Sequence, residues 1–445
     1  MIILRKLKIA IILSLFIISF SNVVLSNAIV FEGKIQKNIY VKDINISNLT
    51  KEEAKEKINK NLSKCNSFLL KLNNNKYTFC NEYIDVDYNV NELVEKAYNI
   101  GRNEGIISNI KIRSDLHFGK KVILDYSVTF DQKKLDKYLS ELNKKIYVRP
   151  VSSTIKINNN QIVISKEKKG YKLNKDELKN TIIRKIKEID NKEEVIPILV
   201  VNPLYTYEDL SKINTILGRF ETHFNSKNYN RVNNIRLAAK ATNNILLDTG
   251  EVFSFNSNIQ NSHIDKYLKE APVIINGKPN KGIGGGMCQV SSTIYNAALY
   301  SGLKIINVRN HSIPSPYIEK GRDATVSVGC IDLKFLNKYN TPIFIYNEVM
   351  DNKIVCTIYG NEKDIKDIEV ITETTDILHN RIIRKNSEKY NLGVRKVEQE
   401  GRKGYKVKTY RVYKNNFGKK TEYIGESYYP PQDKIIIYGT RELRK

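Results

Sequence analysis

The sequence predicts an α+β protein built from several domains, and three observations support this prediction. The chain has 445 residues, which is more than one ordinary hydrophobic core accommodates. From about residue 35 to residue 204, short strands alternate with capped amphipathic helices. After about residue 365, alternating strands and spaced glycines indicate a small all-β module.

The N-terminal segment indicates export. Arg5, Lys6 and Lys8 precede an apolar run from Ile9 to about Leu25, which is the order found in a signal peptide. The run is also nearly long enough to remain in a membrane. We therefore expect residues 1–30 to be a signal peptide or a membrane anchor, and the rest of the chain to be extracytoplasmic.

The net charge of +25 bears on the choice of partners. An exported chain seldom meets nucleic acid, so we expect no nucleic-acid partner. Anionic wall polymers or lipid headgroups suit the charge better. A general bias of composition toward Lys, Asn and Ile explains the charge equally well.

The five cysteines are too few for a disulfide scaffold, and their odd number leaves at least one thiol free. Cys65 and Cys80 are candidates for a disulfide around a strand-turn-strand, whereas Cys330 and Cys356 lie in apolar stretches and are expected to be buried. The sequence has no C-x-x-C or H-x-x-x-H spacing, so we expect neither a metal nor another cofactor.

Four capping signals mark helix starts between residues 35 and about 210. They are Thr50 with Glu53, Asp131, Asn174 with Glu177, and Thr206 with Asp209. No catalytic cluster stands out in this region, so residues 35–204 are expected to bind a partner or to act as a spacer.

Residues 205 to about 362 form the next predicted domain. We expect a helix over 235–247, a strand over 250–256, and further strands over 305–308, 323–328 and 334–344.

Within this domain, three glycines lead into a helix that carries a cysteine. Val290, Ile294 and Leu299 recur at helical spacing, and Gly302 lies where a C-terminal cap is expected. Cys288 therefore lies at the helix N-terminus, where unpaired N–H groups favour a thiolate. The backbone N–H groups of Gly285, Gly286 and Met287, with that of Cys288, are candidates for an oxyanion hole. The alternative is a small buried cysteine beside a glycine hinge.

Several blocks of sequence resemble the VanW domain in the same order. They are 284–293, His311-Ser312 and 321–326, with 250–256 and 271–274 as the upstream blocks. Thr249, Gln260 and Lys266 replace residues that are usual in the family, and they affect turns only. Residues 35–204 resemble a peptidoglycan-binding region, and residues 365–445 resemble the G-five module. The layout is that of a wall protein of Gram-positive bacteria, membrane-anchored or secreted.

The resemblance implies a reaction and a substrate. The family is known through glycopeptide resistance, and some clostridial members are understood to be peptidoglycan L,D-transpeptidases whose motif cysteine is the nucleophile. Carried over to this chain, Cys288 would attack peptidoglycan stem peptides and form a thioester. Peptidoglycan stem peptides and glycan are the implied partners.

The remaining site residues are chosen by their position around the motif. His311 follows a strand in a polar loop and is the expected base, and Asp323 would orient it. Ser291, Ser292, Arg322 and Tyr317 are expected substrate contacts, and His223 beside Glu221 is a rival base. Two other functions stay open: a non-catalytic wall-binding scaffold, and a cysteine peptidase that uses water in place of an amine.

Overall fold

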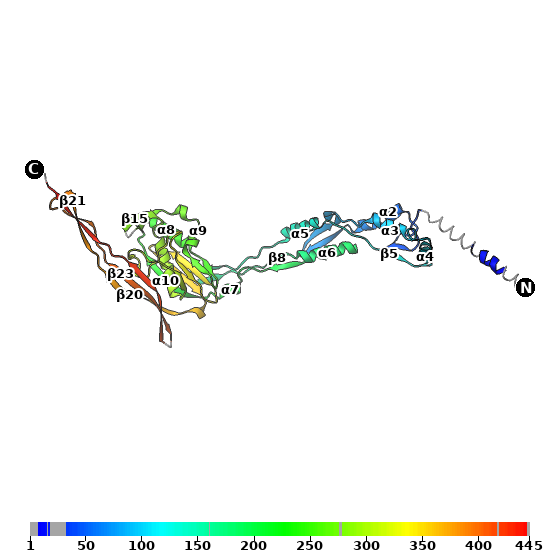
Figure 1. Cartoon of the computed structure of the whole chain (residues 1–445). Helices are drawn as coiled ribbons and strands as arrows, with labels where there is room; N and C mark the ends of the chain where they lie inside the picture. The colour runs from blue at the N-terminus through cyan, green and yellow to red at the C-terminus, as the bar shows by residue number, and fades with distance from the viewer. Residues whose placement is uncertain are drawn as a thin grey trace. The chain divides into compact units, whose positions relative to one another are not determined.

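The computed structural model describes residues 8–15, 17, 33–159, 161–275, 278–415 and 418–442. The chain divides into two compact units, and Figure 1 shows their elements. The first comprises Met1–Val151 and Lys169–Asn202, and the second comprises Ser152–Lys168 and Pro203–Lys445. Both units mix helices with several small sheets, which confirms the predicted α+β class.

Most of the predicted signal peptide or anchor, residues 1–30, lies outside the described residues. Within the described ranges, no helix combines the length and the apolar character needed to cross a membrane.

The first unit places helices over three small sheets, whose strand orders are β2-β1-β5, β4-β3-β9 and β10-β8. Its helices are α2 (Lys51–Leu62), α3 (Val90–Asn99), α4 (Ile106–His117), α5 (Gln132–Ile146) and α6 (Lys175–Glu188). Its strands are β1 (Ile39–Val41), β2 (Ile44–Asn45), β3 (Ser67–Leu72), β4 (Asn75–Cys80), β5 (Val122–Leu124), β8 (Gly170–Leu173), β9 (Glu194–Val195) and β10 (Ile198–Val201). One core of apolar side chains from both helices and strands holds the unit together.

The capping signals predict the helix starts correctly. Thr50 and Thr206 each make a reciprocal capping box, and the side chains of Asp131 and Asn174 accept hydrogen bonds from the first turn of the helix that follows. Each cap satisfies backbone N–H groups that would otherwise have no partner.

Two expectations about cysteines are wrong. Cys65 and Cys80 are both free, because Cys65 lies in a 3₁₀ turn before β3 and the cross-strand partner of Cys80 is Ser67. Cys356 is buried as expected, but Cys330 is exposed, since it lies in a tight turn closed by the bridge between Ser327 and Ile331.

The second unit is built around a four-stranded sheet with the order β11-β19-β18-β12 and a three-stranded sheet with the order β13-β17-β16. Its helices are α7 (Tyr207–Ser211), α8 (Tyr229–Ala241), α9 (Phe255–Asn261) and α10 (Met287–Tyr300). The strands of these sheets are β11 (Thr215–His223), β12 (Ile245–Leu247), β13 (Val252–Ser254), β16 (Lys304–Asn307), β17 (Lys334–Leu336), β18 (Ile343–Val349) and β19 (Lys353–Gly360). Two hairpins also belong to this unit: β6 (Ile155–Asn158) with β7 (Gln161–Ile164), and β14 (Glu270–Ile275) with β15 (Lys278–Ile283).

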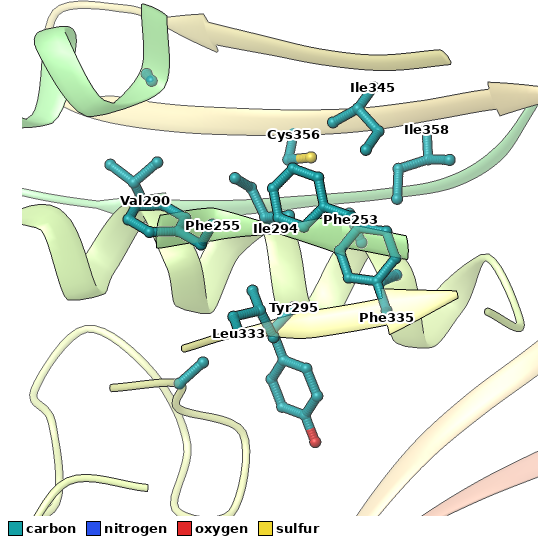
Figure 2. Close-up of a cluster of buried hydrophobic side chains, with 14 of the residues drawn as sticks. Phe253, Phe255, Val290, Ile294, Tyr295, Leu333, Phe335, Ile345, Cys356 and Ile358 are labelled. Carbon is teal, nitrogen blue, oxygen red and sulfur yellow. The ribbon is translucent and has the colours of Figure 1, made fainter. Parts of the chain in front are cut away.

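Helix α10 runs through the core of this unit. Figure 2 shows Val290 and Ile294 of α10 among buried side chains of the sheets, including Cys356 and Phe335. The helix ends as predicted: Ser301 is the C-cap, and Gly302 follows with a φ of 67°. A helix buried along most of its length gives Cys288 a rigid support.

Some predicted elements have different limits. The helix predicted over 235–247 is α8 followed by β12, because Asn244 adopts a positive φ of 56° and breaks the run. The strand predicted over 250–256 stops at Ser254, whose hydroxyl caps α9. Residues 323–328 form no strand but a loop that ends in a single bridge.

The C-terminal part is all β, as predicted, and forms two sheets with the orders β20-β23-β24 and β21-β25-β22. Its strands are β20 (Asp367–Leu378), β21 (Ile382–Asn391), β22 (Arg395–Gln399), β23 (Gly404–Asn415), β24 (Gly418–Tyr429) and β25 (Lys434–Arg441). The fully buried Arg411 donates from Nη1 to the carbonyls of Leu299 and Leu303, at 3.1 and 2.9 Å. This module is therefore bonded directly to the end of α10.

Candidate active site

The glycine turn before α10 brings the backbone close to its neighbours. Gly286, the N-cap, has a φ of 116°, and a Cβ there would lie 2.9 Å from Cγ1 of Ile235. A Cβ on Gly285 would lie 2.6 Å from the carbonyl oxygen of Pro272. Only glycine fits both positions, and the turn places Cys288 second in the helix.

Cys288 interacts with His311, and its thiol also donates to the carbonyl of Val326 at 3.5 Å. Burial raises the pKa of the Cys288 thiol, but the hydrogen bond and charge of His311, with the charge of Arg231, outweigh burial and lower this pKa below its ordinary value. Burial lowers the pKa of His311, but its bonds to Asp323 and Cys288 raise it to about 9. Both shifts favour a thiolate beside an imidazolium.

Asp323 fixes the imidazole of His311. Its Oδ2 lies 2.6 Å from Nδ1 of His311 and accepts the backbone N–H of His311 at 2.7 Å. The carboxylate is 1% exposed, so water does not compete for it. With Nδ1 bonded to Asp323, Nε2 is the ring nitrogen left for Cys288. The structure thus brings together the predicted nucleophile, base and orienting carboxylate.

Tyr429 of the C-terminal module completes this chain of hydrogen bonds. Its hydroxyl donates to Oδ1 of Asp323 at 2.5 Å and accepts the N–H of Gly321 at 2.8 Å. The side chain is fully buried. No sequence motif signals this contact, because Tyr429 lies 106 positions from Asp323.

The predicted oxyanion donors differ in their availability. Across the described ranges, the N–H groups of Gly285, Gly286 and Cys288 donate to no protein acceptor, whereas that of Met287 donates to the carbonyl of Gly284 at 3.1 Å. Met287 is therefore already satisfied, and the other three amides are free for an anion.

Three of the predicted substrate contacts have partners inside the protein. Ser291 donates to the carbonyl of Ala324 at 2.5 Å, and Ser292 accepts the N–H of Ala324 at 2.9 Å. Arg322 donates to Asn296 at 2.7 Å and to Tyr300 at 3.0 Å. These contacts fasten residues 322–324, and with them Asp323, to α10.

The fourth predicted contact, Tyr317, has a hydroxyl of a different kind. Its oxygen is buried and has no hydrogen-bond partner among the described residues. Burial, and then the negative charge of Cys288, raise the pKa of this phenol, so it remains a neutral donor. Tyr317 therefore presents an unused donor near the nucleophile.

Arg231 and Gln289 also belong to the site, and no local sequence pattern predicts their contact. Nη2 of Arg231 donates to Oε1 of Gln289 at 2.7 Å, and the amide of Gln289 donates to Oγ1 of Thr222 and to the carbonyl of His223. The side chain of His223, the rival base, is 63% exposed, and its Nε2 lies 3.4 Å from Oε1 of Glu221. His223 therefore contributes only its backbone carbonyl to the site, as the acceptor for Gln289. In the part of the chain that the structure describes, no cluster of metal-ligating side chains is present.

Three family models match the chain. The "VanW like protein" model matches residues 230–359, the "Putative peptidoglycan binding domain" model matches residues 77–194, and the "G5 domain" model matches residues 368–441. Their order is that of the predicted layout.

Two curated proteins are similar in sequence. The uncharacterized protein YoaR of Bacillus subtilis (strain 168) is 35% identical over 233 residues, which is 52% of this chain and 76% of YoaR. The vancomycin B-type resistance protein VanW of Enterococcus faecalis (strain ATCC 700802 / V583) is 35% identical over 139 residues, which is 30% of this chain and 50% of VanW.

Two solved structures of G5 domains also match a small part of the chain. That of the IgA1 protease is 23% identical with a TM-score of 0.15, and covers 17% of this chain and 93% of its own. That of HP0197 is 22% identical with a TM-score of 0.12, and covers 16% of this chain and 99% of its own. The family matches and the similarity to YoaR lead to one conclusion: the chain belongs to the VanW family, with a peptidoglycan-binding-like domain before its VanW domain and a G5 domain after it.

Proposed function

We propose that this cell-wall protein is an extracytoplasmic peptidoglycan L,D-transpeptidase with Cys288 as its nucleophile. The observation that carries the proposal is the chain of interactions from the half-buried Cys288 through His311 to Asp323, both of which are buried. A thiolate, a base held in one orientation and free backbone N–H groups are what acyl transfer needs.

The first half of the proposed reaction acylates the enzyme. The thiolate of Cys288 attacks the carbonyl carbon of the third residue of a donor stem peptide, and a C–S bond forms. The free N–H groups of Gly285, Gly286 and Cys288 would stabilise the oxyanion of the tetrahedral intermediate. The C–N bond to the terminal D-alanine then breaks, and the leaving amine takes the proton of the His311 imidazolium.

The second half transfers the acyl group. The side-chain amine of a diamino acid on a neighbouring stem attacks the thioester carbon, and neutral His311 accepts the proton of the amine. The C–S bond breaks, which restores the thiolate and imidazolium and leaves an amide cross-link. Asp323 keeps the imidazole in one orientation through both proton transfers, because its Oδ2 holds Nδ1.

The test incubates the purified full chain and its Cys288→Ala variant with a disaccharide-tetrapeptide, and identifies the products by mass spectrometry. A dimer lighter than two substrates by one D-alanine, formed by the native chain alone, supports the transpeptidase. A tripeptide monomer without dimer identifies a peptidase. No product from a folded protein that binds purified wall material identifies a scaffold.

The other parts of the chain would keep this domain at the wall. We propose that residues 35–204 contact glycan, that the net charge of +25 attracts anionic wall polymers, and that residues 1–30 direct or anchor the chain. Sedimentation of the chain with purified wall sacculi, before and after removal of their anionic polymers, separates the first two contributions.

A further inference from the structure

Arg231 of α8 lies across the glycine turn that precedes Cys288. A Cβ on Gly286 would lie 3.1 Å from the carbonyl oxygen of Arg231 and 3.3 Å from its Cγ. Its guanidinium reaches the first turn of α10, where Nη2 donates to Oε1 of Gln289 at 2.7 Å. The cation is therefore next to the residue that follows Cys288.

Gln289 holds this guanidinium in place without neutralising it. The side chain of Gln289 is 1% exposed, and its amide nitrogen donates to Oγ1 of Thr222 at 3.0 Å and to the carbonyl of His223 at 2.8 Å. Because both amide hydrogens are bonded to β11, the Gln289 carbonyl faces Arg231. A carbonyl carries no net charge, and within the described ranges no carboxylate forms an ion pair with Arg231. Arg231 also interacts with the negative charge of Cys288, but no described carboxylate pairs with it, and a half-buried cation of this kind favours an anionic ligand.

Tyr317 supplies a second, independent feature at the same place. Its hydroxyl oxygen is buried and bonded to no group of the described chain, although buried polar groups in folded proteins nearly always have a partner. Arg231 and Tyr317 interact electrostatically with each other, and each also interacts with Cys288. The Arg231 cation, the unpaired Tyr317 hydroxyl and the nucleophile therefore converge on one region.

We propose that Arg231 and Tyr317 form a carboxylate subsite that binds the free C-terminal carboxylate of the donor peptide. This inference rests on the proposed function, which supplies the donor. The guanidinium would bind the carboxylate through paired N–H groups, and the Tyr317 hydroxyl would donate a further hydrogen bond. The terminal carboxylate of such a donor lies one residue beyond the bond that Cys288 attacks. The subsite thus selects peptides that end one residue after that bond, and discriminates against donors that are longer or amidated at their C-terminus.

The experiment measures binding without turnover. In a Cys288→Ala background, which cannot form a thioester, calorimetry compares a stem tetrapeptide with the same peptide as its C-terminal carboxamide. We expect the acid to bind about tenfold more tightly than the amide, since the amide lacks the charge that pairs with Arg231. Adding Arg231→Gln is expected to remove this preference by weakening the acid about tenfold while leaving the amide unchanged. Tyr317→Phe is expected to weaken the acid about threefold.

Two further variants serve as controls. Arg236→Gln removes an exposed arginine from the same helix and is expected to leave both affinities unchanged. Arg231→Lys keeps the charge but loses the paired geometry, so part of the preference for the acid should remain. This variant also tests the subsite should Arg231→Gln fail to fold.

The outcomes distinguish a failure of the carboxylate subsite from a failure of the transpeptidase proposal. The subsite is overturned if Arg231→Gln weakens the binding of the acid and of the amide equally. It is also overturned if the preference for the acid does not depend on Arg231. Both conclusions hold whatever reaction the native chain catalyses. If the native chain forms no cross-link but the Cys288→Ala protein prefers the acid through Arg231, the subsite stands and the transpeptidase proposal fails.

Discussion

Tyr429 donates its hydroxyl hydrogen to one carboxylate oxygen of Asp323, whose other oxygen holds His311. The two residues are 106 positions apart, and Tyr429 belongs to the C-terminal module. Asp323 is buried, so each of its oxygens depends on protein donors for solvation. The orientation of the base therefore depends on a module that contributes no other group to the triad.

The first prediction concerns Tyr429→Phe. The variant leaves Oδ1 of Asp323 buried without its donor, which costs about 1–3 kcal/mol. We expect a lower Tm and about a tenfold loss in the rate of thioester formation, because His311 is held less firmly. Calorimetry and intact-protein mass spectrometry measure the two effects.

The neighbouring tyrosine provides a matched control. Tyr428 precedes it on the same strand and is 50% exposed, so Tyr428→Phe should change neither quantity. Equal effects of the two substitutions would show that the hydrogen bond to Asp323 has no influence on the site.

The second prediction concerns the thiol itself. Because the pKa of Cys288 is lowered mainly by His311 against the opposing effect of burial, iodoacetamide should modify Cys288 at pH values where an ordinary thiol is largely protonated. His311→Ala removes the stabilising cation, so the modification should need a higher pH. Peptide mass spectrometry across about pH 5 to 10 follows the rate.

The exposed Cys330 gives an internal comparison in the same samples. Its rate should not respond to His311→Ala. An unchanged pH profile for Cys288 in this variant would refute the thiolate–imidazolium pair.

The third prediction is a fall in activity at alkaline pH. His311 must carry a proton to give to the leaving amine, and its pKa is raised to about 9 by Asp323 and Cys288, which outweigh burial. Thioester formation should rise with pH as Cys288 loses its proton and fall as pH passes about 9, where the imidazolium loses its own. Single-turnover rates from acid to alkaline pH measure both limbs. A rate that keeps rising beyond this range would exclude His311 as the acid.

Local sequence predicts the parts of this site that depend on nearby residues. The glycines before Cys288, the end of α10 at Gly302 and the caps at Thr50 and Thr206 follow from short-range backbone geometry. His311 and Asp323 could be placed only because they lie in blocks that resemble a known family.

The parts of the site without a sequence signal depend on long-range contacts. Arg231 is 58 positions from Gln289, and no local pattern signals that pair. Ser291 lies three residues after Cys288 and so on the same face of the helix, but only the folded chain shows the backbone of Ala324 against that face. A short-range signal also cannot tell a substrate contact from a positioning residue.

The fourth prediction tests the glycine turn. Gly286→Ala places a Cβ 2.9 Å from Ile235 at a positive φ, so we expect a loss of about 2 kcal/mol in the free energy of unfolding. Gly105 is also a helix N-cap, but it has a negative φ and no atom near the position of a Cβ. Gly105→Ala should therefore cost much less, and denaturant unfolding compares the two. Similar costs would contradict the steric account of the turn.

The last prediction concerns Arg411, which bonds the C-terminal module to the end of α10. Arg411→Met preserves bulk but removes the guanidinium bonds to the carbonyls of Leu299 and Leu303. It also removes the ion pair with Glu422, which keeps the hydroxyl of Tyr413 as a donor. The carbonyl of Leu299 keeps the N–H of Gly302 as a donor, so the carbonyl of Leu303 is the one left without its partner, and we expect a loss of about 2 kcal/mol. Arg384→Met, an exposed substitution in the same module, should cost almost nothing in the free energy of unfolding.

Because Arg411 binds one end of α10 and Cys288 lies at the other, thermal unfolding and Cys288 modification should be measured on the same samples. A lower Tm with unchanged modification would show that the module stabilises the helix without shaping the site. A lower Tm together with a changed rate of Cys288 modification would show that the module supports α10 along its whole length.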